Sequence, residues 1–224
     1  AWGGRLADGL DTIEDGAPQQ VIRAINDPVY PHTGLKWLTG NLAPNGAVIK
    51  PVAASQALLQ HTGRAVVFDG LEDLSRRIDD PALDVQATDV LVLRGIGPRA
   101  AGMPEAGLIP IPKQLAAKGV KDMVRISDGR MSGTAFGTIV LHISPEAAVG
   151  GPLAWVRSGD LIRLDVMAGT LDLMISDEAL EARKANPVTV PLLPAERGYA
   201  RLHAEQVTQA EEGCDFRFLK GLKG

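Results

Sequence analysis

Short apolar runs separated by turn residues follow one another from residue 35 to residue 175. Eight of them have the length and the aliphatic or β-branched content typical of strands. They cover residues 35–38, 47–49, 63–68, 90–93, 122–126, 138–142, 161–165 and 170–175. Glycine, proline, asparagine and aspartate separate nearly all of them. The pattern therefore predicts a domain built largely from short strands.

Helical spacing appears in fewer places. Residues 70–78 carry apolar side chains at helical spacing, and residues 112–118 favour a second short helix. Residues 176–184 begin with a serine N-cap, continue with acidic residues and end with basic ones, as a capped helix does. Three prolines in 186–194 indicate an extended arm, and we expect a helix over 195–211. Strands and helices together predict a mixed α/β domain rather than a doubly wound sheet.

Proline punctuation near residues 27–31 suggests a boundary between two parts of the chain. We expect residues 1–34 to be an N-terminal extension or linker, with a short helix within residues 12–26. Residues 35–186 form the main domain, and residues 187–224 form the extended arm and C-terminal helix. The chain opens without an initiator methionine, which is compatible with a fragment of a longer protein.

The composition excludes several classes of partner. The chain has 224 residues, of which 45% are hydrophobic and 22% charged, and its formal net charge is -4. Basic residues are scattered, so we expect no nucleic acid or anionic membrane as partner. No apolar run approaches the roughly 20 residues of a membrane span, and no signal peptide opens the chain, so we expect a cytoplasmic protein. The single cysteine, Cys214, excludes an internal disulfide and an iron–sulfur cluster bound by this chain alone.

The segment 124–137 runs from an apolar strand into a loop of glycine, serine, threonine and arginine. Ser127, Ser132 and Thr134 offer hydroxyl groups, and the glycines allow the backbone to approach a ligand closely. Arg130 adds a guanidinium that can bind two oxygens of an anion. This composition indicates a site for a small, oxygen-rich anion.

The residues alone leave alternatives at this site. Ser127 competes with Ser132 as the reactive hydroxyl. Arg125 competes with Arg130 as a carboxylate ligand, and either arginine can instead be structural. Glu105 lies on a loop of small residues and prolines, where a carboxylate suits a hard cation such as Mg²⁺ or is simply solvated.

Two other readings are disfavoured. His142 lies in an alternating strand pattern and is expected to be packed or half-exposed. Because the chain has no Gly-x-Ser-x-Gly elbow, a hydrolase that uses Ser132 with His142 is disfavoured. The segment 95–99 resembles a phosphate-binding loop but lacks its third glycine and the Lys-Ser or Lys-Thr that follows, so we discount nucleotide binding.

Five ordered motifs give the chain a resemblance to a known family. They lie at residues 40–50, 63–68, 102–105, 126–137 followed by 142–152, and 156–162. In this order they resemble the C-terminal part of the family that joins dihydroxy-acid dehydratase to the sugar-acid dehydratases. The resemblance covers roughly residues 35–177, and residues 197–199 with 213–216 resemble the end of the sugar-acid branch.

The resemblance implies a swivelling β/β/α barrel-like domain with short helices and a C-terminal helical tail. It also implies that Glu105 is a Mg²⁺ ligand, that Ser132 removes the C2 proton of the substrate, and that Thr134 contacts a substrate hydroxyl or carboxylate. An iron–sulfur cluster, held by three cysteines of a missing N-terminal domain, would complete the active site. We therefore expect the isolated chain to be inactive, its main partner to be that domain, and the enzyme to be a homo-oligomer, either a dimer or a tetramer.

The loop sequence bears on the substrate. Residues 130–136 read Arg-Met-Ser-Gly-Thr-Ala-Phe, which resembles the sugar-acid branch, whereas the branched-chain enzymes have glycine where Thr134 stands. We therefore expect a hydro-lyase that converts an aldonate to its 2-keto-3-deoxy acid. The alternatives are a dihydroxy-acid dehydratase of branched-chain amino-acid synthesis and a stand-alone, non-catalytic binding domain.

Overall fold

A computed structural model describes residues 26–27, 34–105, 109–131, 136–192, 194 and 196–221. The chain divides into two compact units, Ala1–Thr33 and Gly34–Gly224. Only Asn26 and Asp27 of the first unit are described, so the helix expected within 12–26 lies almost wholly outside the described residues. The account below concerns the second unit.

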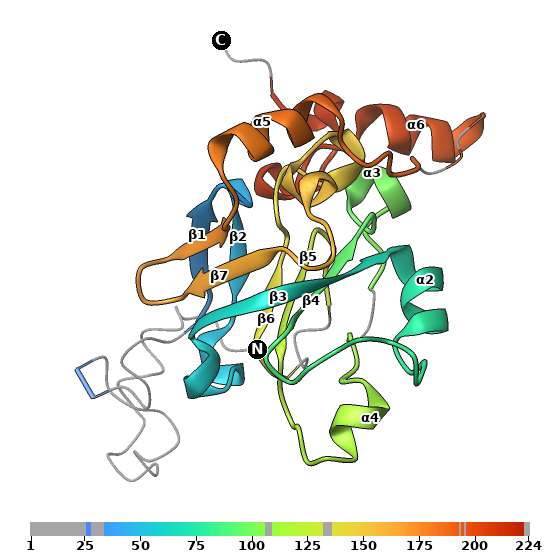
Figure 1. Cartoon of the computed structure of the whole chain (residues 1–224). Helices are drawn as coiled ribbons and strands as arrows, with labels where there is room; N and C mark the ends of the chain where they lie inside the picture. The colour runs from blue at the N-terminus through green and yellow to red at the C-terminus, as the bar shows by residue number, and fades with distance from the viewer. Residues whose placement is uncertain are drawn as a thin grey trace, which may run out of the picture. The chain divides into compact units, whose positions relative to one another are not determined.

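Eight strands of the second unit close into a barrel (Figure 1). They are β1 (Lys36–Gly40), β2 (Ala43–Ile49), β3 (Gln60–Asp69), β4 (Val90–Arg94), β5 (Val124–Ser127), β6 (Ile139–Leu141), β7 (Leu161–Asp165) and β8 (Thr170–Leu173). The order around the barrel is β1-β2-β6-β5-β4-β3-β7-β8. Each strand overlaps one predicted run, so the predicted mixed α/β, barrel-like fold is confirmed.

One wall of the barrel is parallel. Strands β3, β4, β5 and β6 pair in parallel in that spatial order. The neighbouring pairs β2–β6, β1–β2, β3–β7 and β7–β8 are antiparallel, and β1 and β8 pair in parallel through Thr39 and Thr170. As a result, the loops that follow the parallel strands leave from the same end of the barrel.

The apolar pattern of each strand matches its surroundings. All five residues of β4 are buried, because Val90 and Val92 face the barrel interior while Leu91 and Leu93 pack into a second cluster outside it. Helix α2 (Gly70–Arg77) contributes Leu74 to that outer cluster. Strand β7 alternates instead, and only one of its faces is buried. A parallel strand covered on both faces reads as a continuous apolar run, whereas a one-sided strand alternates.

Four further α-helices complete the described part of this unit. They are α3 (Pro98–Ala101), α4 (Lys113–Ala116), α5 (Asp177–Ala185) and α6 (Gly198–Gln206). Short 3₁₀ turns lie at Pro51–Ala53, Gln56–Leu58, Ala147–Val149, Pro152–Trp155, Ala210–Glu212 and Arg217–Leu219. The predicted N-cap of α5 is confirmed, because the Ser176 hydroxyl accepts the N–H of Ala179 at 3.3 Å.

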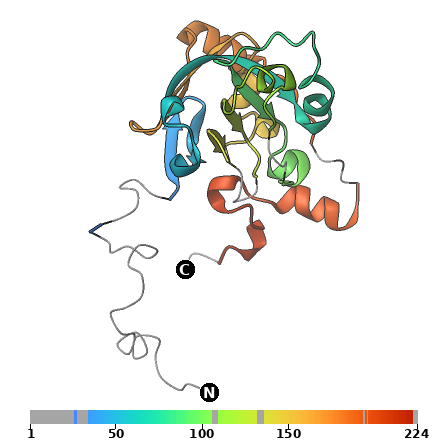
Figure 2. The ribbon, with the colours of Figure 1, turned by 90° about the horizontal axis from the view of Figure 1, so that it is seen from below.

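The predicted helix over 195–211 is too long. Helix α6 ends at Gln206, where Val207 turns to an extended conformation and forms an isolated antiparallel bridge with Phe216. The periodic pattern continues past this point, but pairing with a residue farther along the chain ends the helix. Figures 1 and 2 both place α6 beside α3, near the loops that follow the parallel strands.

No helix in the described ranges combines the length and the apolar character that a membrane crossing requires.

Candidate functional site

The segment that follows α3 meets the segment that follows β5. Strands β5 and β6 pair in parallel, and Arg130 lies in the segment that leaves β5. Glu105, which follows α3, pairs with Arg130 in a parallel bridge. Met131 joins the apolar cluster outside the barrel. The fold thus brings two of the predicted site residues together.

The Glu105 and Arg130 side chains face each other without a tight ion pair. The distance from Arg130 Nη1 to Glu105 Oε2 is 4.0 Å, and both side chains are about half exposed, at 48% and 49%. Arg130 is oriented by another contact, since its Nε donates to the Met103 carbonyl oxygen at 3.0 Å. The carboxylate and the remaining guanidinium nitrogens therefore stay accessible to a ligand.

Backbone strain is concentrated around Arg130. In the described ranges, the residues other than glycine with positive φ are Met103 (53°), His142 (56°) and Cys214 (53°). Met103 accepts the Arg130 hydrogen bond, and the Arg130 charge acts on both His142 and Cys214. Left-handed backbone at such residues costs about 1–3 kcal/mol and tends to occur at functional sites. The strain marks this region independently of any sequence motif.

His142 and Cys214 are held uncharged beside Arg130. Burial lowers the pKa of His142, and the positive charge of Arg130 lowers it further. Burial raises the pKa of the Cys214 thiol, as do the charges of Glu146 and Glu211, while Arg130 opposes the rise. At neutral pH the surroundings of Arg130 therefore present a neutral imidazole and a thiol.

Asp128 ties the loop after β4 to the segments after β5 and β6. Its buried carboxylate accepts N–H bonds from Gly95 at 3.1 Å, Ile96 at 3.2 Å and Ala147 at 3.0 Å. Burial raises the pKa of Asp128 to about 6, although the three N–H donors oppose that rise. Asp128 thereby fixes the start of both segments that carry the candidate residues.

Arg125 is buried and makes structural contacts. The side chain is 2% exposed and pairs with Asp122 at 2.9 Å. It also donates to the carbonyl oxygens of Ile109 at 3.0 Å and Phe136 at 3.2 Å. Gly137 makes room for it, since a Cβ there would lie 1.9 Å from Arg125 Nη2. Of the two arginines, Arg130 is the one with a half-exposed side chain, so it stays the candidate carboxylate ligand.

Ser127 is also structural. Its side chain is fully buried, and its hydroxyl accepts the N–H of Gly129 at 3.0 Å within the turn that follows β5. A substrate cannot reach it there. Ser132 and Thr134 lie outside the described residues, between Met131 and Phe136.

The described residues could supply one ligand to a metal ion, but they do not form a complete metal site. Among them, no group of three or more His, Cys, Asp or Glu residues could hold a metal ion. Glu105 nevertheless has the chemistry of a Mg²⁺ ligand, because its carboxylate is half exposed and only loosely paired. A magnesium ion bound by Glu105 would need further ligands from outside the described residues.

Sequence reasoning missed part of this site. It treated His142 as an ordinary strand residue, and it assigned no role to Asp128, Glu146 or Cys214. A weak signal existed for His142, since histidine is one of the residue types enriched in the left-handed conformation. For the other three, only the tertiary structure brings their side chains together.

Comparison with known proteins agrees with the sequence motifs. Residues 20–214 match the family described as dihydroxy-acid/6-phosphogluconate dehydratase C-terminal. The chain is 52% identical to L-arabonate dehydratase of Azospirillum brasilense over 92% of its length, and 51% identical to 6-deoxy-6-sulfo-D-gluconate dehydratase of Pseudomonas putida over 98%. It is 40% identical to dihydroxy-acid dehydratase of Methanoregula boonei over 89%. These matches span 36%, 38% and 35% of the relatives' own lengths, so the chain corresponds to little more than a third of each.

Proposed function

The chain belongs to the dihydroxy-acid/6-phosphogluconate dehydratase C-terminal family, and from this premise we propose that it is the C-terminal part of a sugar-acid hydro-lyase. Identity favours this branch, because two relatives named for sugar acids reach 51–52% while the dihydroxy-acid dehydratase reaches 40%. The reaction would remove water from an aldonate and give a 2-keto-3-deoxy acid.

The pairing of Glu105 with Arg130 carries the proposal. The proposal is supported by a carboxylate and a guanidinium that lie together, with Arg130 two residues before Ser132 in the chain. A 2,3-dihydroxy acid needs both groups, because its carboxylate must be bound and its C2 proton must be made acidic.

Each residue then has a distinct role. Arg130 binds the substrate carboxylate, Thr134 binds a hydroxyl, and Ser132 accepts the C2 proton. Serine is a weak base, so its alkoxide must be stabilised, for which nearby backbone N–H groups are suited. The C3 hydroxyl leaves as the enol forms, and the enol rearranges to the keto acid.

Two cofactors belong to the proposal. Glu105 would supply one ligand to Mg²⁺, and an iron–sulfur cluster would be held by the part of the enzyme outside this chain, because this chain has a single cysteine. When bound, the metals stabilise negative charge on the substrate and assist departure of the hydroxyl group.

The substrate class is the direct test. For the full-length enzyme, kcat/KM for a C5 or C6 aldonate is expected to exceed kcat/KM for 2,3-dihydroxyisovalerate by about 100-fold or more, because a site that hydrogen-bonds a hydroxyl rejects analogues lacking it. The variant Thr134→Gly should reduce the ratio of the two kcat/KM values. A preference of the wild-type enzyme for the branched acid would overturn the assignment.

A further inference from the structure

The segment after α6 folds back on itself against the barrel. Val207 bridges Phe216, and the N–H of Thr208 donates to the Asp215 carbonyl oxygen at 2.8 Å. The side chains of Val207 and Thr208 are buried. We call residues 207–216 the tail loop. It is an ordered part of the domain, although the strand pattern ends more than thirty residues earlier.

The tail loop binds the segment after β6 through Gln209 and also through Glu211, whose carboxylate accepts the Ser144 hydroxyl. Gln209 Nε2 donates to Glu146 Oε1 at 2.7 Å, and Gln209 Oε1 accepts the N–H of Glu146 at 2.9 Å. The same amide thus satisfies both the side chain and the backbone of Glu146. Gln209 leads to the candidate site, because Glu146 in turn holds the helix that precedes Glu105.

Glu146 fixes the first turn of α3. Its carboxylate accepts the N–H of Arg99 at 2.9 Å and the N–H of Ala100 at 3.0 Å, and the residue is 1% exposed. The fit is close, since a Cβ on Gly97 would lie 2.5 Å from Glu146 Oε2. The donors described here are neutral, so the buried carboxylate depends on every hydrogen bond it receives.

Helix α3 leads directly to the metal-binding candidate. It ends at Ala101 and is capped by Gly102, and the next residues are Met103, whose carbonyl oxygen orients Arg130, and then Pro104 and Glu105. A second contact ties the same helix to α6, because Arg99 Nε donates to the Ala204 carbonyl oxygen at 3.1 Å. A continuous chain of contacts therefore runs from Gln209 through Glu146 and α3 to Glu105.

We propose that Gln209 is a positioning residue that, through Glu146 and α3, holds the Glu105 segment in place for metal binding. The inference rests on the proposed function in taking Glu105 as a Mg²⁺ ligand. It assigns the tail loop a role in tuning the metal site from outside the barrel. A purely structural role would lower stability and leave the metal requirement unchanged.

The test compares variants of the full-length enzyme. Gln209→Met keeps the volume of the side chain and removes both hydrogen bonds, and Gln209→Ala serves as a second variant. The matched control is Gln114→Met, because Gln114 Nε2 also donates to a carbonyl oxygen, that of Leu83 at 3.0 Å, but from α4. Glu105→Gln reports on the ligand itself.

Two measurements are made on each variant. Amide hydrogen exchange, followed without substrate, reads the order of residues 99–105. Magnesium titration of activity reads the concentration that gives half of the maximal rate. We expect Gln209→Met to speed exchange of the Arg99 and Ala100 amides at least 10-fold. We expect it to raise the half-maximal Mg²⁺ concentration about 10-fold with little change in kcat at saturating Mg²⁺. Gln114→Met should change neither.

The two failures are distinguishable. Unchanged exchange in both Gln209 variants, or an unchanged Mg²⁺ requirement while Glu105→Gln raises it, would overturn the positioning role and leave the proposed function standing. If Glu105→Gln itself leaves the Mg²⁺ requirement unchanged, the assignment of Glu105 as a ligand fails. The exchange rates then still decide whether Gln209 orders the Glu105 segment.

Discussion

Two buried carboxylates stand at opposite ends of β5 and are stabilised in opposite ways. Asp122, before the strand, pairs with Arg125 and accepts hydrogen bonds from Thr138 and Ser55. Asp128, after the strand, accepts only backbone N–H bonds among its described contacts. The cation nearest in sequence to Asp128 is Arg130, which stays half exposed.

The difference separates a charge-paired structural cluster from the candidate site. Burial alone would raise the pKa of Asp122, but its hydrogen bonds lower that pKa below the usual value. Burial raises the pKa of Asp128 to about 6. At the first end of the strand the charges neutralise each other. At the second end the protein leaves its cation available, which is what a site for an anionic substrate requires.

Removing the cation of the structural cluster should have the largest effect on stability. Arg125→Met leaves Asp122 buried without its ion-pair partner, which is expected to lower the free energy of unfolding by about 3–5 kcal/mol. Urea unfolding of the chain, followed by circular dichroism, measures this change in the free energy of unfolding.

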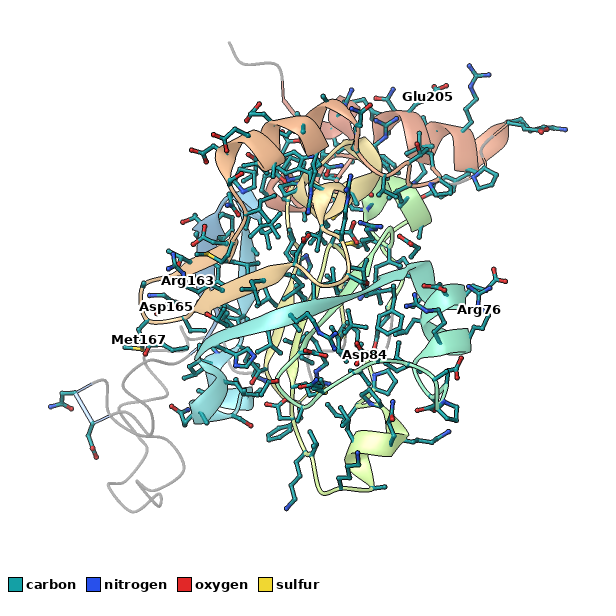
Figure 3. The ribbon with its side chains drawn as sticks, viewed as in Figure 1. Arg76, Asp84, Arg163, Asp165, Met167 and Glu205 are labelled. Atoms are coloured by element: carbon teal, nitrogen blue, oxygen red, sulfur yellow. The ribbon has the colours of Figure 1, made fainter. Side chains whose placement is uncertain are left out.

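The control for this prediction is Arg163→Met on β7 (Figure 3). Arg163 lies 3.5 Å from Asp172 and is 51% exposed, so its loss should cost less than about 1 kcal/mol. Equal effects of the two substitutions would contradict the distinction between a buried cluster and a surface pair.

The pH dependence should differ in sign at the two ends of β5. The pKa of Asp128 is raised in the folded state, so the native protein binds more protons than the unfolded chain between about pH 4 and pH 6. Its contribution to stability is therefore present at low pH and lost as the pH rises through 6. The lowered pKa of Asp122 acts oppositely, since its contribution is lost as the pH falls below about 4.

Relative to the wild type, the free energy of unfolding of Asp128→Asn should therefore increase by about 2–3 kcal/mol between pH 4 and pH 7. Urea unfolding at a series of pH values checks this prediction. A constant difference between the two proteins over that range would show that Asp128 ionises normally in the folded state.

The strands could be predicted because the pattern of apolar residues along the chain matches which faces of each strand are buried. Continuous apolar runs such as 90–93 and alternating runs such as 161–165 each gave a strand of the expected kind. The end of α6 was not predictable, since it depends on pairing between Val207 and Phe216, which no local pattern indicates.

The site was predictable only in part. Glu105 and Arg130 were named from the sequence and lie together. The sequence could not show which of Arg125 and Arg130 is buried. Arg125 is buried because Asp122 and Gly137 enclose its side chain, and no local pattern indicates these contacts. The hydrogen bonds between Gln209 and Glu146 could not be predicted from the sequence, because these residues are more than sixty positions apart. Ser132 and Thr134 remain predictions.

The central claim is that Ser132 is the base and that Ser127 is structural. The most direct measurement is aldonate turnover by the full-length variants Ser132→Ala and Ser127→Ala, with their thermal unfolding recorded in parallel. We predict that Ser132→Ala loses at least about 100-fold in kcat at an unchanged unfolding temperature. Ser127→Ala should instead keep its turnover and unfold at a lower temperature. Near-normal turnover by Ser132→Ala would contradict the account.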